Sequence, residues 1–316
     1  MSKQARNYRL NLESLEARKL MAGDVIAALE GSFLRVEGDN FGNQVAISQT
    51  AVGDVVIAGQ NGTTINGLPS VRFVRPQINA LELRMEGGND VVTLRGLNVA
   101  NDLFVDLGAG DDRLTTPATS PVTVGANASV FGSEGNDTVQ LNSMTVREDL
   151  FVDGGLGALN ATFNNLQVDK ALSVLGDDAI DVINISNSRV GLGVAVEAKG
   201  GSDRVSLTDV SAFALSINTD ANGAIGADQV NLTRVTTQED LGIFTGAGND
   251  VVRLTDVSSG KSIIVSLDEG NDRLIATRVS AAEDAVFEGG AGVDILENFG
   301  MSAGIKREFK EFETVR

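Results

Sequence analysis

The amino-acid sequence predicts an all-β protein wound as a right-handed parallel β-helix, or β-solenoid, of about ten coils. Three observations predict it: aspartate returns at a fixed interval, glycine stands two residues before almost every one, and apolar residues alternate with polar ones in between. A unit of this length cannot bury its own apolar face. Successive units must therefore stack, each about 4.8 Å from the last.

The aspartates define ten slot positions, one in each coil. Successive slots lie 22 residues apart, except at two places where three extra residues raise the interval to 25. Leucine fills one slot, at Leu159. The other nine are Asp90, Asp112, Asp137, Asp181, Asp203, Asp228, Asp250, Asp272 and Asp294.

The residues around each slot predict a tight turn followed by short strands. Glycine stands two residues before the slot in nine of ten copies, with Ala179 as the exception, and glycine favours tight turns. Apolar residues then follow with period two in three segments, which predicts three strands per coil with alternate side chains inward. One such set is Val92, Leu94, Leu97, Val99, Leu103 and Val105. The handedness follows from the right-handed crossovers of parallel strands.

Four parts of the chain are expected. Residues 1–23 form a charged amphipathic segment with Leu12, Leu15 and Leu20 near one helical face, and residues 24–80 form an entry cap of short strands that does not keep the slot register. Residues 81–297 form the solenoid, and residues 298–316 cover its last coil. Caps of this kind protect strand edges from pairing with other chains. Strands of the entry cap are expected at 33–38, 45–47, 55–59 and 71–74.

Composition excludes several classes of function. The chain contains neither cysteine nor histidine, which removes disulfides, Cys–His and Ser–His–Asp catalysis and the ordinary zinc site. The net charge of −18 and the absence of a basic stripe argue against nucleic-acid binding. No run of 18 apolar residues is present, so no membrane span is expected.

The turn residues resemble the calcium repeats of hemolysin-type proteins. Residues 289–296 match the GGxGxDxU pattern of that family in full, and residues 246–252 and 108–114 match most of it. The resemblance implies calcium held by hard oxygens from successive turns. The implied ligands are Asp90, Asp112, Asp137, Asp228, Asp250, Asp272 and Asp294. The last three coils, where Asp268 and Glu269 add oxygens, are the best stretch, and Leu159 interrupts a continuous row.

The pattern also departs from that family. Its repeats come every nine residues, whereas here the motif appears once in 22 residues, so the family's site geometry is not carried over. The alternative is structural, since an aspartate in a turn commonly accepts backbone N–H bonds within its own loop.

A second resemblance lies near the N-terminus. Residues 15–22, Leu-Glu-Ala-Arg-Lys-Leu-Met-Ala, are similar to the LExRxLL segment of many exported planctomycete proteins, with Met21 in place of leucine. This implies an extracellular or cell-surface protein. The segment lacks the apolar core of a secretory signal peptide, and the alternative is an ordinary capping helix.

These observations predict a non-enzymatic, exported β-solenoid with a structural or adhesive role, stabilised by calcium in one version of the hypothesis. Its partner would be extracellular matrix, a polysaccharide or a protein ligand. The alternative is a polysaccharide lyase or hydrolase, because parallel β-helices include such enzymes. An enzyme would carry a clustered, non-repeating set of polar residues in a groove, whereas a scaffold would present the same outward face coil after coil.

Overall fold

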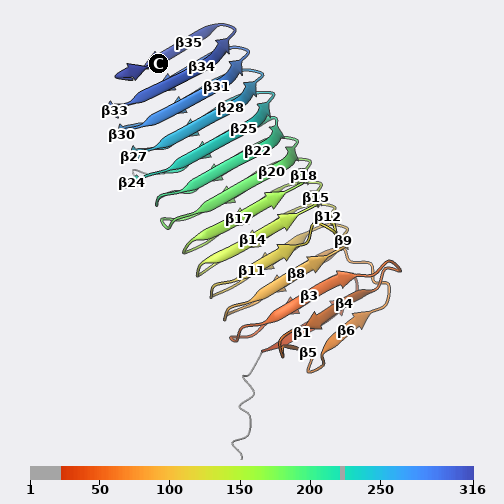
Figure 1. The fold of residues 1–316 in the computed structure, drawn as a ribbon. Coiled ribbons are helices and arrows are strands. Elements are labelled where there is room, and N and C mark those ends of the chain that lie inside the picture. The colour runs from red at the N-terminus through yellow and green to blue at the C-terminus, as the bar shows by residue number, and fades with distance from the viewer. Residues whose placement is uncertain (1–22, 221–224) are drawn as a thin grey trace, which may run out of the picture.

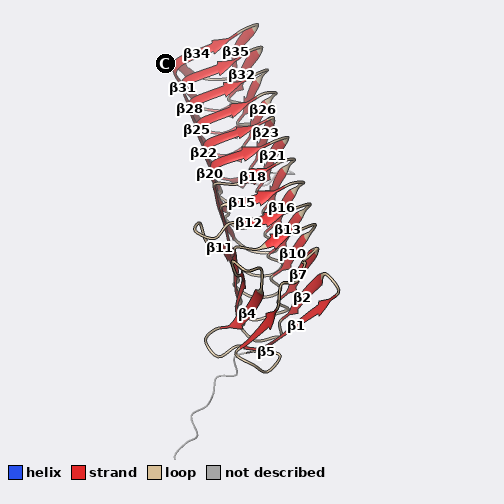
Figure 2. Ribbon diagram, turned by 90° about the vertical axis from the view of Figure 1, so that its right-hand side faces the viewer, coloured by secondary structure: helices blue, strands red, loops and turns tan. Residues whose placement is uncertain are grey.

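The computed structural model describes residues 23–220 and 225–316, which form a β-solenoid with no helix in these ranges. Two large sheets, of 14 and 18 strands, run the length of the molecule and enclose the core (Figures 1 and 2). The prediction of an all-β parallel solenoid is thus confirmed. The amphipathic segment predicted for residues 1–23 lies outside the described residues, apart from Gly23.

Each coil contributes one strand to the first sheet and one or two to the second. The 14-stranded sheet contains β1 (Asp24–Glu30), β2 (Phe33–Glu37), β5 (Thr64–Ile65), β7 (Ala80–Arg84), β10 (Leu103–Asp106), β13 (Ala128–Phe131), β16 (Leu150–Asp153), β19 (Leu172–Leu175), β21 (Gly193–Glu197), β23 (Ala214–Asn218), β26 (Leu241–Phe244), β29 (Ile263–Ser266), β32 (Asp284–Glu288) and β35 (Lys306–Lys310). The 18-stranded sheet contains β3 (Gln44–Gln49), β4 (Val55–Gly59), β6 (Ser70–Phe73), β8 (Val91–Arg95), β9 (Asn98–Val99), β11 (Arg113–Thr116), β12 (Val122–Val124), β14 (Asp137–Asn142), β15 (Met144–Val146), β17 (Leu159–Asn164), β18 (Gln167–Val168), β20 (Val182–Val190), β22 (Arg204–Ala212), β25 (Gln229–Thr237), β28 (Val251–Ser259), β31 (Arg273–Ala281), β34 (Ile295–Ala303) and β36 (Thr314–Val315). Two small sheets join β24 (Ile225–Gly226) to β27 (Ala247–Gly248) and β30 (Glu269–Gly270) to β33 (Ala291–Gly292).

The strands stack in the register that the slot spacing predicts. In the 14-stranded sheet Leu103 pairs with Leu81 of the coil before and Ala128 of the coil after, all in parallel. The apolar residues at the predicted inward positions are buried, from Val92 to Val105 in one coil and from Val139 to Val152 in another. Because each coil buries the same positions, the core is one continuous apolar column.

The first two strands of a coil merge in the C-terminal half. From β20 onward, they form a single nine-residue strand rather than the two short ones predicted. A residue with positive φ still bends this strand, for example Asn187 at 49° and Asp256 at 55°. The predicted corner is therefore present, although the backbone pairing continues through it.

The entry cap shares its strands with the solenoid. Its antiparallel pairs are β1 with β2, β3 with β4 and β4 with β6, as expected for a hairpin-like cap. However, β2 also pairs in parallel with β7, and β3 pairs in parallel with β8. Parallel stacking therefore begins near residue 33, with the β4–β6 hairpin inserted into the first coil.

At the other end, the chain continues the stack. β35 pairs in parallel with β32, and β36 pairs in parallel with β34. The segment predicted to cover the last coil thus lies on it as one further turn. Among the described residues, no helix is long and apolar enough to cross a membrane.

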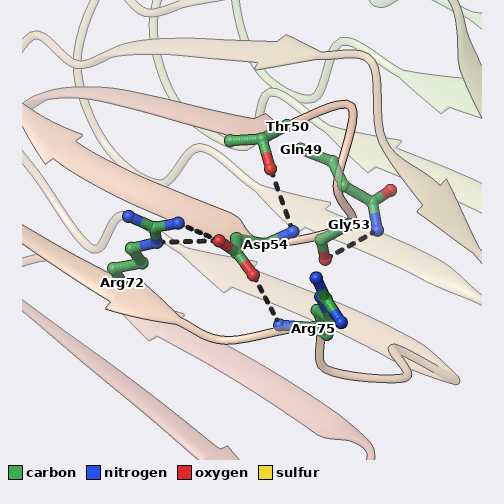
Figure 3. A network of polar contacts seen from close by, with 6 residues as sticks. All are labelled: Gln49, Thr50, Gly53, Asp54, Arg72 and Arg75. Atoms are coloured by element: carbon green, nitrogen blue, oxygen red, sulfur yellow. Dashed lines mark hydrogen bonds and ion pairs between the residues drawn. The ribbon is translucent and has the colours of Figure 1, made fainter.

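A buried carboxylate fixes the hairpin of the entry cap (Figure 3). Asp54 is 2% exposed and accepts hydrogen bonds from the Arg72 guanidinium and from the backbone N–H of Arg75 at 2.9 Å. Its own N–H donates to the Thr50 hydroxyl at 3.0 Å. The Arg72 hydrogen bond holds the pKa of Asp54 below its usual range. Because a lowered pKa favours the folded state only where the carboxyl is ionised, this stabilisation is lost on acidification.

We expect Arg72→Met to lower the thermal unfolding midpoint at pH 7, because it leaves the buried Asp54 carboxylate with a single hydrogen bond, from the Arg75 N–H. The difference from the wild-type protein should shrink as the pH falls below 4. Arg75→Met is the matched control, since Arg75 reaches Asp54 through its backbone N–H. Equal losses in the two variants at pH 7 would contradict this account.

Candidate functional site

The predicted slot aspartates lie in one column along the stack, where each turn leads into the 18-stranded sheet. All nine are 0–2% exposed, so these carboxyls face the interior. The column extends beyond the ten predicted slots. Asn43 occupies the equivalent position one coil before Asp90, and Glu313 one coil after Asp294, according to the strand register.

The carboxylates form an inner ladder between coils. Oδ1 of Asp203 accepts the backbone N–H of Asp181 at 2.7 Å, and Oδ1 of Asp294 accepts that of Asp272 at 2.8 Å. The same bond recurs from Asn43 to Asp90 at one end, and Glu313 receives the N–H of Asp294 at the other. The structural alternative thus named the right acceptor, but only Asp181 also accepts an N–H from its own loop, that of Asp177. The ladder N–H comes from the preceding coil, whereas a bond within the same loop was expected.

Leu159 interrupts the inner ladder without breaking the stack. It still donates its N–H to Oδ1 of Asp181 at 2.7 Å, but it cannot accept one. The N–H of Asp137 donates to the Ala158 carbonyl at 2.9 Å. A coil can therefore satisfy this N–H by another route when the slot holds no carboxylate.

An outer ladder, in which the residue before the slot supplies the acceptor in six of the ten coils, runs in the opposite direction. Oδ1 of Asn89 accepts the N–H of Asp111, and Oδ1 of Asp111 accepts the N–H and side-chain amide of Asn136. Asn249 and Asn271 repeat the pattern near the C-terminus. Here the acceptor belongs to the earlier coil. Each turn is thus bonded to its neighbours on both sides by side chains as well as by its backbone.

The second carboxylate oxygen of the inner ladder has no such bond. Oδ2 is buried and lacks a hydrogen-bond partner in eight of the nine slot aspartates, whereas in Asp181 it accepts the N–H of Asp177 at 3.2 Å. The eight are Asp90, Asp112, Asp137, Asp203, Asp228, Asp250, Asp272 and Asp294. A buried charge without full compensation favours its neutral form.

Burial therefore raises the pKa of the slot carboxyls, and neighbouring carboxylates add to the effect in several of them. The pKa rises to about 8 for Asp90 and Asp203 and to about 7 for Asp112 and Asp250. It rises to about 6 for Asp137, Asp181 and Asp272. The accepted N–H bonds act in the opposite direction but do not cancel the cost of burial. A substantial part of the ladder is thus protonated near neutral pH.

The geometry tests how well calcium would fit the column. The described residues include no group of three or more acidic side chains placed to hold one metal ion together. One oxygen of each carboxylate is already engaged by an N–H. An ion at the predicted ligands would therefore depend on one or two carboxylates with backbone carbonyls, so the calcium role stays a prediction.

A column of charged residues escaped sequence reasoning. At the bend of the 18-stranded sheet, consecutive coils place Asp209, Arg234, Asp256 and Arg278 above one another, all with positive φ. Arg234 bonds to Asp209 and Arg278 to Asp256, each through two nitrogens. The alternation of sign is visible at a spacing of 22 to 25 residues, six positions after each slot.

The outer face of the 14-stranded sheet contains an apolar groove of about 480 Å³. It crosses β19, β21, β23 and β26 and continues to Ile264 of β29. Asp240 is the only charged residue in its lining. It holds no cluster of acid and base groups.

No protein-family model matches this chain, and neither a curated protein nor a solved structure matches it. The fold and the ladder geometry are therefore the basis for any functional inference.

Proposed function

We propose that this protein is a non-enzymatic scaffold, an exported β-solenoid with a structural or adhesive role. The observation that carries the proposal is the repetition of the same polar devices in coil after coil. The inner and outer ladders engage their acidic and amide groups in bonds between coils. Groups used in this way hold the rod together and leave its two long faces for contact.

The contrast with an enzyme supports the same proposal. A polysaccharide lyase or hydrolase needs a base and charge-stabilising groups gathered at one place. The described acidic groups with the largest pKa shifts are distributed along the stack and are buried. The apolar groove is lined mainly by small side chains.

The experiment that tests the proposal combines binding and turnover on the same substrates. The full chain is incubated with insoluble polysaccharides and matrix proteins, and the bound fraction is measured alongside the release of new reducing ends or unsaturated products. Retention without product formation is expected. Catalytic product formation that is absent after heat denaturation would overturn the scaffold proposal in favour of the enzyme alternative.

Export rests on the resemblance of residues 15–22 to the LExRxLL segment. We expect residues 1–24 fused to a reporter to direct it out of a planctomycete host cell. The matched control replaces Arg18 and Leu20 by alanine in the same fusion. Equal retention of both reporters in the cell would contradict export by this segment.

Calcium stabilisation is tested by thermal unfolding of chelated protein with and without added calcium. If a site in the last three coils binds calcium with a Kd of about 10 μM, 1 mM calcium should stabilise the fold by about 2.7 kcal/mol. Asp272→Asn should remove this shift, because Asp272 belongs to the implied ligand set. Asp203→Asn should keep it, because Asp203 does not. An unchanged midpoint on adding calcium to the wild-type protein would exclude the site.

A further inference from the structure

The outer face of the 14-stranded sheet carries an aromatic ridge. Phe104 on β10, Phe131 on β13 and Phe151 on β16 point outward, with ring centroids 5.5 and 5.6 Å apart. The Arg84 guanidinium lies 4.7 Å from the Phe104 centroid and closes the ridge at its N-terminal end. Three successive coils thus raise a block of aromatic surface above the sheet.

The next coils form a trough in the same line. The strand register continues from Phe151 to outward residues with small side chains, and the row beside it is also small. The row that continues from Phe151 contains Ser173, Ala195, Ser216 and Gly242. The row beside it contains Ala171, Gly193 and Ala214. Phe244 and Ile264, each 39% exposed, form the far wall. These residues line the groove of about 480 Å³.

We propose that this face is a self-association surface that binds a second copy of the chain in an antiparallel arrangement. The twofold axis would run along the strand direction, between β16 and β19. Such an axis places the strands of one copy on those of the other in reverse order, so β16 faces β19, β13 faces β21 and β10 faces β23. Phe104 and Phe151 of each ridge then enter the trough of the other copy, opposite Ser216 and Ser173, as an isologous interface requires. Phe131 lies one row further along the strand, opposite Glu197.

The distribution of acidic residues favours this alignment in a protein with a net charge of −18. In the antiparallel dimer, the acidic Asp102 and Asp149 lie opposite the small residues Ala214 and Ala171. Arg84 lies opposite Phe244, a pairing that permits a cation–π contact. No acidic residue of the 14-stranded sheet between β7 and β26 faces another in this register.

A parallel dimer places the same residues unfavourably. With the twofold axis along the stack and through the row of Phe104 and Phe151, each coil would face the same coil of the other copy. Asp102 would then lie opposite Asp106, and Asp149 opposite Asp153, while ridge would meet ridge. Like charges directly opposite one another destabilise an interface. The sequence of this face therefore selects the antiparallel arrangement.

The area is sufficient for a stable pair. Eight strands at about 4.8 Å and roughly five residues at about 3.3 Å give about 600 Å² for each copy, or about 1,200 Å² in total. Specific interfaces begin at about 1,000 Å². The proposal concerns assembly and does not depend on which extracellular ligand the protein binds.

The first test is the association state of the full chain by sedimentation velocity from about 1 to 100 μM, the weak end of the range for interfaces near this size. A monomer–dimer equilibrium is expected. Ser216→Arg should weaken it at least about tenfold, because it fills the trough with a charged side chain. Ser206→Arg is the matched control, since Ser206 faces outward on β22 of the opposite sheet. A wild-type monomer throughout, or equal dimerisation of the two variants, would overturn the proposal.

The second test determines the alignment by disulfide cross-linking. Because the chain has no cysteine of its own, only the introduced cysteines can react. Ser129→Cys and Ala195→Cys lie on β13 and β21, which face each other in the antiparallel dimer. Oxidation of the mixed variants should give a disulfide-linked dimer. Each variant alone should give little, because its own copies lie about three coils, or about 14 Å, apart. Cross-linking of Ser129→Cys with itself and not with Ala195→Cys would show the parallel alignment and overturn the one proposed.

Discussion

The thermal unfolding midpoint of this protein is expected to fall as the pH is raised from 5 to 8, opposite to the usual effect of buried, paired carboxylates. Seven of the nine slot carboxyls have pKa values raised to about 6 to 8 in the folded chain, whereas an aspartate in the unfolded chain titrates near 3.9. Between these values the folded state binds more protons than the unfolded state. Stability therefore declines as the pH rises through this window.

Proton linkage gives the sign and the size of this change in stability with pH. A carboxyl with a raised pKa is neutral in both states below about pH 4, so its contribution is fully present there. Each unit of rise corresponds to about 1.4 kcal/mol, so a single carboxyl at about 6 loses about 3 kcal/mol of favourable contribution once both states are ionised. Several such groups lie in one column. Circular dichroism melts at constant ionic strength, without calcium, would measure the slope.

Asp203→Asn is the variant that isolates the ladder from the rest of the molecule. The amide oxygen can accept the Asp181 N–H as the carboxylate does, and it never ionises. Asn43 shows that the column admits an asparagine, since it occupies the slot of the first coil. The variant should be more stable than the wild type at pH 8 and should show a shallower slope from pH 5 to 8. A wild-type midpoint that rises over this interval would refute the protonated ladder.

Much of the fold is predictable from the sequence because one unit is repeated. The slot interval predicts which strands pair, as Leu103 with Leu81 and Ala128 shows. Alternation of apolar residues predicts which side chains are buried, and it does so for both Val92 and Val152. In a stack of equivalent coils, the residue pattern within one coil also determines which residues of neighbouring coils are in contact.

The remaining features depend on geometry that the pattern does not contain. Asn43 lies 47 residues before Asp90 because a hairpin is inserted, so no count of 22 residues finds it. The direction of the inner ladder requires knowing that Oδ1 reaches the preceding coil. At the bend of the 18-stranded sheet, the residue with positive φ is serine, asparagine, aspartate or arginine in different coils. The sequence therefore shows no consistent residue type that would predict the bend.

Replacing Gly270 by alanine is expected to lower the free energy of unfolding by about 3 kcal/mol or more, because two penalties combine. Its φ of 157° is one that alanine rarely adopts, and an added Cβ would stand 1.4 Å from the Gly248 carbonyl oxygen of the preceding coil. Gly292 has the same relation to Gly270. A displaced turn would therefore disturb the coils on both sides, and urea unfolding measured at pH 6 would report the loss.

Gly53→Ala is the control that separates the close approach from backbone strain. Gly53 has a φ of 92° and no atom within 4 Å of an added Cβ, so only the conformational penalty of about 1 kcal/mol is expected. Ala179 shows how a coil avoids the clash. It is the single alanine at this turn position, it has no positive φ, and the side chain of Asp177 accepts its N–H at 2.8 Å. In the coil of Gly270 the equivalent residue is Asp268, but it has a φ of 64° and its carboxylate accepts the Ser266 hydroxyl at 2.6 Å, so it is not placed as Asp177 is. Equal losses for Gly270→Ala and Gly53→Ala would mean that the coils can separate at the turn, and that glycine there serves only the backbone conformation.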